Sequence, residues 1–418
     1  MRQAVTLLHR WFGLGAALFL FIAGITGAVI SWDHELDDWL NPHLHESRAE
    51  GPALDALTAA ALVEARDPRI RVAYLPLAAE PGETLSLVVL PKLDQTTGRL
   101  FEPGYNQLFL DPVTGEEVGR RLWGQVWPIT SETLISFLYK LHYSLHFPEI
   151  GGIDRWGMWL LGIIALGWTI DCFGGFYLTL PSQRSTGGKT WLSRWAPAWK
   201  IKTSGGAYRI NFDIHRAFGL WTWALLLILA FTSFSLNLYR EAFMPLMTLV
   251  SQPTPTPFDL RKPAPKHQPV EPKISLADAV ALGSAEAARR GWVEPAGAVS
   301  YSPAYGFYSV SFFHPGDDHG AAGVGPAALY FDGADGRYLG DRVPWVGTAA
   351  DIFIQAQFPL HSGRILGLPG RIMISIMGIV VAALSVTGVV IWLRKRRARL
   401  GLAAKRQTST TSELKAAE

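Results

Sequence analysis

A seven-residue phrase occurs twice and constrains this chain more than any other feature of its sequence. Residues 8–14 read Leu-His-Arg-Trp-Phe-Gly-Leu, and residues 214–220 read Ile-His-Arg-Ala-Phe-Gly-Leu. Each copy stands at the beginning of a long apolar run. Each therefore places one His and one Arg near the first turn of a predicted membrane helix. An imidazole that enters hydrocarbon is costly and usually functional. Its repetition at the same depth indicates two ligands that face each other.

Four apolar runs have the length of about 20 residues that a helix needs to cross a bilayer. They cover residues 11–31, 153–180, 214–238 and 367–393. We expect the first run to be an uncleaved helix, because it is long for the apolar part of a secretory signal and no small-residue cleavage site follows it. The sequence therefore predicts an integral membrane protein with four transmembrane α-helices.

Basic residues predict which side of the membrane each segment occupies. The segment at 181–212, between the second and third runs, contains six basic residues and no acidic one: Arg184, Lys189, Arg194, Lys200, Lys202 and Arg209. The fourth run is followed directly by Arg394, Lys395, Arg396 and Arg397. The positive-inside rule places these segments and both termini in the cytoplasm, and the two long segments outside.

The two long segments repeat one order of elements. The first contains a helical pattern and three strand-like runs (54–65, then 71–75, 84–90 and 107–110), closed by a turn at 111–115. The second begins with a Pro-rich linker at 252–273 and repeats the order (276–290, then 298–301, 305–313 and 328–332), closed by a turn at 332–336. We expect two external α+β domains, each a helix on a small antiparallel sheet. The chain is then internally duplicated.

The predicted organisation follows from these patterns in chain order. It consists of a first span (1–31), a first outer domain (32–130), an interfacial helix with the second span (131–180), a basic cytoplasmic loop (181–212), a third span (213–239), a linker with the second outer domain (240–366), a fourth span (367–394) and a basic cytoplasmic tail (395–418).

A second His repeat lies where each outer segment returns to the membrane. His142 stands in Leu-His-Tyr-Ser-Leu before the second span, and His361 in Leu-His-Ser-Gly-Arg before the fourth. Two imidazoles on facing helices can hold one haem iron axially. We therefore expect His9 with His215, and His142 with His361, to ligate the metal of two haems, one in each leaflet. About twenty helical residues at about 1.5 Å each separate the pairs by about 30 Å, so electrons could cross in a relay.

Several nearby residues have more than one interpretation. His146 lies one turn after His142 and could be the ligand in its place, a second ligand or an interfacial residue; His142 ranks first because it matches His361. Arg10 and Arg216 inside, and Arg364 with Arg155 and Arg371 outside, could pair with haem propionates or anchor phospholipid. Gly24, Gly27, Gly378 and Gly388 would let helices or a flat ring approach closely.

Other polar residues in and near the spans are less specific. His34, His43 and His45, and separately His314 and His319, lie in acidic stretches whose spacing fits no metal site, so we interpret them as solvated loops. Asp171 is buried by its position in the second span and could handle protons or pair with a neighbour. The single cysteine, Cys172, allows no intrachain disulfide.

The absence of certain motifs limits the possible partners. There is no phosphate-binding loop, nicotinamide-binding motif or metalloprotease motif, and no catalytic residue is assigned. An electron donor must then come from elsewhere, either a quinol or a cytoplasmic reductase. The net charge of the chain is only +3. We therefore expect the chain to associate with the lipid bilayer and not with nucleic acid.

The segments that contain these histidines resemble those of a known family, and the resemblance spans nearly the whole chain. The opening Leu8-His9-Arg10-Trp11-x-Gly13-Leu14, the elements at 141–145 and 214–220, and the closing Thr387-Gly388 are similar to the PepSY-associated transmembrane family. The turn at 111–115 looks like the end of a PepSY domain. Pro148-Glu149 departs from the Gly-rich stretch that follows the second His in the family. The resemblance implies a Gram-negative inner-membrane protein like the ferrioxamine-type siderophore reductases, which carry two b-type haems and reduce ferric siderophore in the periplasm.

Two classes of function follow. The first is a haem-dependent ferric-siderophore reductase, an oxidoreductase of iron uptake. The second is a non-enzymatic membrane sensor or assembly factor whose outer domains bind a periplasmic peptide or protein. A permease is disfavoured, because no pair of Gly- or Pro-interrupted helices offers a midplane site.

Overall fold

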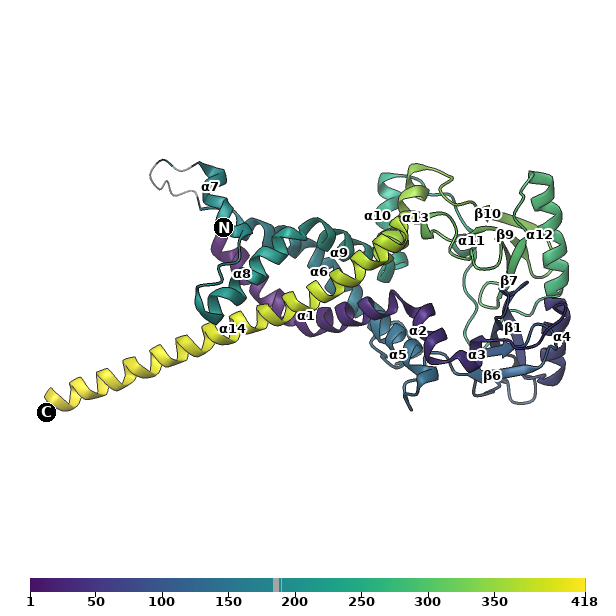
Figure 1. Cartoon of the computed structure of the whole chain (residues 1–418), viewed down its shortest axis with the longest axis horizontal. Helices are drawn as coiled ribbons and strands as arrows, with labels where there is room; N and C mark the ends of the chain where they lie inside the picture. Colours follow the sequence, from purple (N-terminus) through teal and green to yellow (C-terminus); the bar gives the residue numbers. More distant parts are fainter. Residues whose placement is uncertain (183–187, 189, 418) are drawn as a thin grey trace. The chain divides into compact units, whose positions relative to one another are not determined.

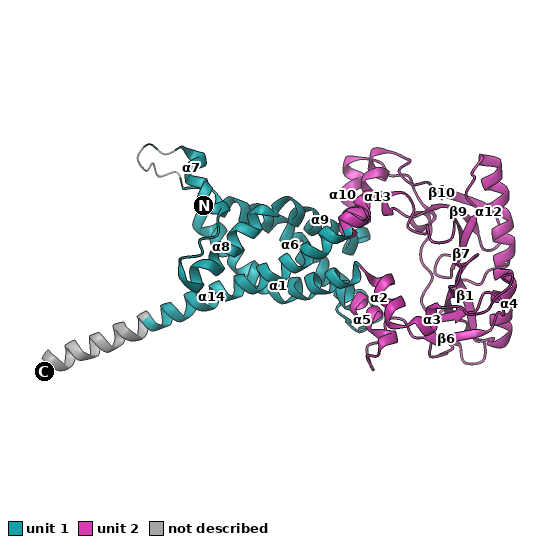
Figure 2. Cartoon of the chain, viewed as in Figure 1, with its two compact units in different colours: residues 1–31, 141–243, 371–418 teal, residues 32–140, 244–370 magenta. Residues whose placement is uncertain are grey.

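A computed structural model describes residues 1–182, 188 and 190–417, with side chains described as far as residue 401. The chain forms two compact units (Figure 2). The first comprises residues 1–31, 141–243 and 371–418, and the second comprises residues 32–140 and 244–370. Arg184 and Lys189 of the predicted basic loop lie outside the described residues.

The first unit consists of long apolar helices (Figure 1). Three of them are long and apolar enough to cross a membrane: α1 (Arg2–Ile30), α6 (Trp156–Thr179) and the Leu368–Gly401 part of α14 (Leu368–Ala417). Side chains of α6, α9 (Trp223–Asn237) and α14 form its buried apolar core, including Leu226, Ala230 and Met377. The chain is therefore a membrane protein.

The predicted third span is not one continuous helix. It is divided into α8 (Gly206–Trp221) and α9, which are bent by 72° relative to each other. The described residues therefore contain four candidate spans only if this bent pair counts as one. Thr222 leaves the helical conformation between them (φ −104°, ψ 11°). The indole of Trp221 donates to the carbonyl of Trp199, and that of Trp223 donates to the carbonyl of Cys172. These two anchors hold the adjoining turns in different directions.

Two segments predicted from their basic charge contain helices. Helices occupy much of the predicted loop at 181–212, namely α7 (Trp191–Trp195), the short helix η1 (Ala196–Trp199) and the beginning of α8. The predicted tail at 395–418 continues α14 as far as Ala417.

The second unit is built on one antiparallel sheet of eight strands, in the order β10-β9-β8-β7-β1-β2-β5-β6. The N-terminal half contributes β1 (Ile70–Pro76), β2 (Leu85–Pro91), β5 (Gln107–Leu110) and β6 (Glu117–Arg121). The C-terminal half contributes β7 (Ala296–Ser302), β8 (Phe307–Phe312), β9 (Ala327–Asp332) and β10 (Tyr338–Arg342). A separate short pair, β3 (Leu93–Asp94) and β4 (Arg99–Leu100), follows β2.

The two halves are joined at the centre of this sheet. β1 pairs with β7 in the register Tyr74↔Ser300 and Leu75↔Val299. The expected separate outer domains, 32–130 and 240–366, therefore share one continuous sheet instead of forming two. Pairing β1 with β7 satisfies the backbone groups of what would otherwise be two exposed strand edges.

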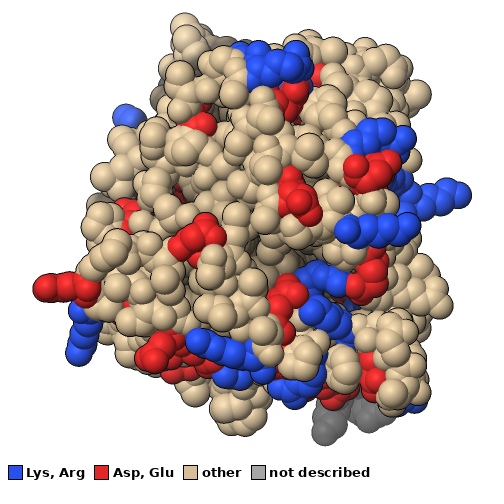
Figure 3. All heavy atoms as spheres, turned by 90° about the vertical axis from the view of Figure 1, so that its right-hand side faces the viewer, with Lys and Arg blue, Asp and Glu red and all other residues tan. Residues whose placement is uncertain are grey.

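One helix from each half covers the same face of the sheet. These helices are α4 (Ala56–Arg66) and α12 (Leu276–Arg290), and Figure 1 shows both against the strands. Small residues on both, such as Ala60 and Ala279, pack on buried strand residues including Leu87 and Val299 in one hydrophobic core. Among the described residues that Figure 3 shows on this side, basic and acidic side chains are interspersed, as on a solvated surface.

Shorter helices complete the second unit. They are α2 (Asp33–Leu40), α3 (Pro42–His45), α10 (Met244–Val250), α11 (Pro257–Leu260), α13 (Ala349–Ser362), η3 (Ala321–Gly323) and η4 (Arg364–Leu366). A further helix, α5 (Ser131–Ser144), precedes α6 just as α13 precedes α14. The order of elements in the two halves is therefore duplicated, as the sequence predicts.

Candidate functional site

The structure brings the two histidines of the repeated phrase together. His9 of α1 and His215 of α8 have ring centroids 6.2 Å apart, with their planes inclined at 59°. A neutral imidazole binds a metal at about 2.0–2.1 Å, and its nitrogen lies roughly 1.1 Å from the ring centre, so two rings across one metal are separated by roughly 6–6.5 Å. The measured separation fits one metal atom between the two rings.

Each of these imidazoles has a partner at Nδ1. His9 Nδ1 lies 3.0 and 2.9 Å from the two carboxylate oxygens of Asp171 on α6. His215 Nδ1 lies 2.9 Å from Thr387 Oγ1 on α14. The Thr387 hydroxyl donates to the carbonyl of Ala383, so its oxygen accepts the Nδ1 hydrogen of His215. Both rings then carry hydrogen at Nδ1, which leaves the Nε2 lone pair for a metal, as is usual for ligating histidines.

Glycines of neighbouring helices lie beside the ligand candidates. A Cβ atom on Gly175 of α6 would lie 3.6 Å from Cε1 of His9, and one on Gly388 of α14 would lie 3.3 Å from Cε1 of His215. A methyl group would be crowded against the His215 ring at Gly388, whereas at Gly175 it would make an ordinary contact with the His9 ring. The sequence analysis identified Gly388 as a site of close approach but not Gly175.

The histidine that precedes the second span has a similar environment. His142 lies near the end of α5, and its Nδ1 is 3.0 Å from the carbonyl oxygen of Ala23 and 3.0 Å from Thr26 Oγ1, both on α1. A Cβ on Gly27 would lie 2.9 Å from Cε1 of His142. A backbone carbonyl cannot donate, so it also fixes the hydrogen on Nδ1.

The remaining histidine candidates lie in different surroundings. His361 is in the last turn of α13, in the second unit, and its pairing with His142 stays a prediction. The expectation that His146 shares a helical face with His142 is wrong, because α5 ends at Ser144. Leu145 and His146 have positive φ angles of 54° and 52°, which redirect the chain before His146 is reached.

The predicted arginine partners also differ from one another. Arg216 donates to the fully buried Asp213 at 2.7 Å and to the carbonyl of Pro197 at 2.6 Å, so its guanidinium already has protein partners. Arg364 lies 3.7 Å from Asp33. The Nε atoms of Arg10 and Arg216 are both buried and have no hydrogen-bond partner among the described residues. An unmet donor on the residue that follows each of the two histidines fits a bound carboxylate such as a haem propionate.

Two histidines interpreted as solvated loop residues meet in the second unit. The rings of His34 and His319 pack edge to face with centroids 5.4 Å apart. His319 lies 2.5 Å from Asp318, and this hydrogen bond lowers the pKa of the Asp318 carboxyl although burial opposes the shift. Within the described part of the chain, no group of three His, Cys, Asp or Glu side chains is arranged to hold a metal ion.

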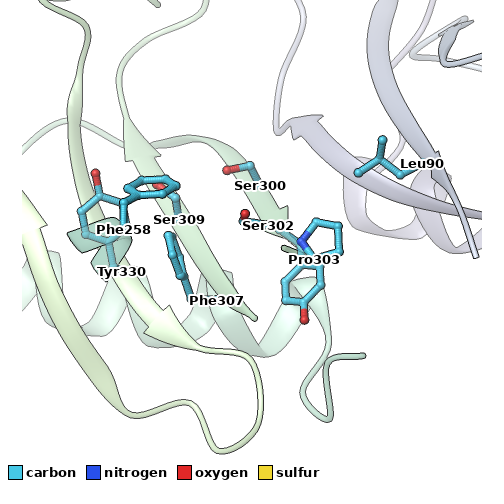
Figure 4. Close-up of a pocket in the computed structure, with 9 residues that line it drawn as sticks. Leu90, Phe258, Ser300, Ser302, Pro303, Phe307, Ser309 and Tyr330 are labelled. Atoms are coloured by element: carbon cyan, nitrogen blue, oxygen red, sulfur yellow. The ribbon is translucent and has the colours of Figure 1, made fainter. Parts of the chain in front are cut away.

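A pocket of about 350 Å³ lies on the sheet of the second unit (Figure 4). Its lining contains the hydroxyl groups of Ser300, Ser302 and Ser309, and its wall includes the aromatic rings of Phe307 and Tyr330. No charged side chain is among the described residues that line it. Such a lining suits a neutral ligand with hydrogen-bonding groups and an apolar part.

Comparison with known proteins gives the family. None of the curated proteins compared with the chain matches it. The model of one family, the PepSY-associated TM region, matches residues 6–395, which include all four candidate haem ligands. From this match over nearly its whole length, the chain belongs to the PepSY-associated transmembrane family.

Proposed function

We propose that the chain is an inner-membrane di-haem b reductase, which passes electrons across the membrane to reduce a ferric siderophore in the periplasm and release Fe(II). The observation that supports this most directly is the pair His9 and His215, 6.2 Å apart and each held at Nδ1. Haem b, when bound between two such imidazoles, supplies one-electron redox chemistry.

The residues of this chain would bind and orient the two haems. His9 and His215 hold the inner one, and Arg10 pairs with a propionate. On the outer side, the ligands are His142, whose ring is fixed by Ala23 and Thr26, and His361. Reduction assists release because Fe(II) is a poorer partner than Fe(III) for the hard oxygen ligands of a chelator.

Haem content tests the binding part of this proposal. A reduced-minus-oxidised spectrum and a pyridine haemochrome assay of the detergent-purified protein should give two b-type haems per chain. His9→Ala and His215→Ala should each reduce the number to one. His43→Ala is the matched control, because that exposed histidine pairs with Glu132 in the second unit and should leave two. Protein expressed with ample haem that binds none would remove the reductase proposal.

The reaction itself is tested in proteoliposomes. Protein reduced through the lumen should form Fe(II) from an external ferric siderophore, detected with a colorimetric Fe(II) chelator, and His9→Ala should abolish this transfer. A rate equal to that of protein-free liposomes would contradict a reductase.

A second candidate function is a non-enzymatic sensor or assembly factor that binds a periplasmic peptide or protein. The uncharged pocket on the sheet favours it, since Ser300, Ser302 and Ser309 offer hydroxyl groups to a ligand (Figure 4). Colourless protein that still binds a periplasmic peptide would favour this function over the reductase.

A further inference from the structure

The two inner ligand histidines have chemically different partners. Asp171 presents both carboxylate oxygens to His9 Nδ1, at 3.0 and 2.9 Å. Thr387 presents a single hydroxyl oxygen to His215. His142, on the outer side, has the carbonyl oxygen of Ala23 and the hydroxyl of Thr26 at its Nδ1. Of these three imidazoles, only His9 contacts a carboxylate through Nδ1.

The environment of Asp171 indicates that this contact is its role. The residue lies within α6, a candidate membrane span, and its side chain is only 16% exposed. Among the described residues, His9 is the single hydrogen-bond partner of the Asp171 carboxylate, and no Lys or Arg forms an ion pair with it. A carboxylate in a membrane helix is costly, and it persists when it is paired and functional.

A carboxylate at Nδ1 changes what the imidazole does at Nε2. Accepting the Nδ1 hydrogen raises the basicity of the ring and fixes its tautomer and orientation. A more basic axial ligand stabilises the oxidised metal relative to the reduced one, and second-sphere hydrogen bonding is one of the means by which a protein adjusts a haem potential. Neutral oxygen acceptors, such as those beside His215 and His142, have a weaker effect.

We propose that Asp171 is a positioning residue that gives the inner haem the lower of the two reduction potentials. This inference rests on the proposed function. An electron that enters at the cytoplasmic side would then move to a site of higher potential at the periplasmic side. The carboxylate therefore sets the direction of transfer without touching the haem.

The test is a potentiometric titration of the full-length protein in detergent, followed by absorbance. The wild type should show two midpoint potentials. Asp171→Asn should raise the lower one and leave the higher one unchanged, and Asp171→Glu should restore the low value. Thr387→Val should shift the lower potential by less than Asp171→Asn does, because it removes a neutral partner.

The outcomes separate this inference from the proposed function. A wild type without haem defeats the proposed function. A wild type with two haems whose potentials are both unchanged in Asp171→Asn, or in which the higher one moves, overturns the inference alone. If Asp171→Asn binds only one haem, recovery of the low-potential haem in Asp171→Glu supports the inference, and loss in both variants overturns it.

Discussion

Gly24 of α1 and Gly378 of α14 meet backbone to backbone. A Cβ atom on Gly24 would lie 2.6 Å from the carbonyl oxygen of Gly378. Along the same seam, Arg371 of α14 donates twice to the carbonyl of Ser31, at 2.9 and 2.6 Å. Small residues let membrane helices approach closely enough for such contacts. The close crossing fixes α1, which carries His9, against α14, which carries Thr387.

We predict that Gly24→Ala destabilises the protein. The added methyl group must push the two backbones apart, and overpacking of this kind costs about 1–3 kcal/mol. Thermal unfolding in detergent, followed by circular dichroism, should show a lower Tm.

Gly13→Ala in the same helix is the control for this substitution. A Cβ at Gly13 would meet no atom within 4 Å, so that variant should match or slightly exceed the wild type. Equal Tm values for the two variants would show that the Gly24 contact does not limit stability.

A buried ion pair supplies a second prediction. Arg121 of β6 donates to both carboxylate oxygens of Asp37, at 2.9 and 2.6 Å, and the two residues are 7% and 8% exposed. Removing the guanidinium leaves the buried carboxylate with only its contacts to His45 and Asn41, and breaking a buried ion pair costs about 3–5 kcal/mol. Arg121→Ala should therefore unfold at a clearly lower denaturant concentration than the wild type.

Arg120, the neighbouring residue, serves as the matched control. It pairs with Glu117 and is 48% exposed, and exposed pairs contribute about 0–1 kcal/mol. Arg120→Ala should lie close to the wild type. If Arg121→Ala and Arg120→Ala lose similar stability, the buried pair of Arg121 and Asp37 does not account for the attachment of α2 to the sheet.

The same carboxylate predicts a pH dependence. Burial acts to raise the pKa of Asp37, but hydrogen bonds from His45 and Arg121 outweigh it and hold this pKa well below its usual range. The unfolded value is about 3.9. Because the folded pKa is the lower one, the stabilisation is present above about pH 4 and is lost as the pH falls toward the folded pKa.

Comparison of the wild type with Asp37→Asn isolates this contribution. The difference in their free energies of unfolding should be largest at neutral pH and should shrink progressively below about pH 4. A difference that stays constant between pH 7 and pH 3 would assign the stabilisation to packing rather than to the charge of Asp37.

The sequence predicts some of these features and conceals others, for physical reasons. The pairing of His9 with His215 could be predicted, because a repeated phrase places both imidazoles at the same depth in two helices. Asp171 could be recognised as costly in its span, but its partner could not. Which residues on four helices face each other depends on how each helix is rotated about its axis, and one sequence does not specify those rotations.

The shared sheet and the bent third span were hidden for related reasons. Each half has a pattern that a separate domain or a joined one would satisfy equally, so the β1–β7 pairing could not be inferred. The apolar run at 214–238 is continuous, and hydropathy does not register the break at Thr222. That break depends on contacts of Trp221 and Trp223 with residues outside the run.

The last prediction distinguishes the two candidate ligands His142 and His146. His142→Ala should reduce the haem content from two to one per chain, whereas His146→Ala should leave two. His142 lies within α5, and Ala23 and Thr26 of α1 orient its ring. The helix ends before His146, because the chain changes direction at Leu145. A pyridine haemochrome assay on the purified variants measures both. If His146→Ala loses the haem and His142→Ala retains it, the haem ligand is His146, which follows the end of α5. The contacts of His142 with α1 then serve helix packing.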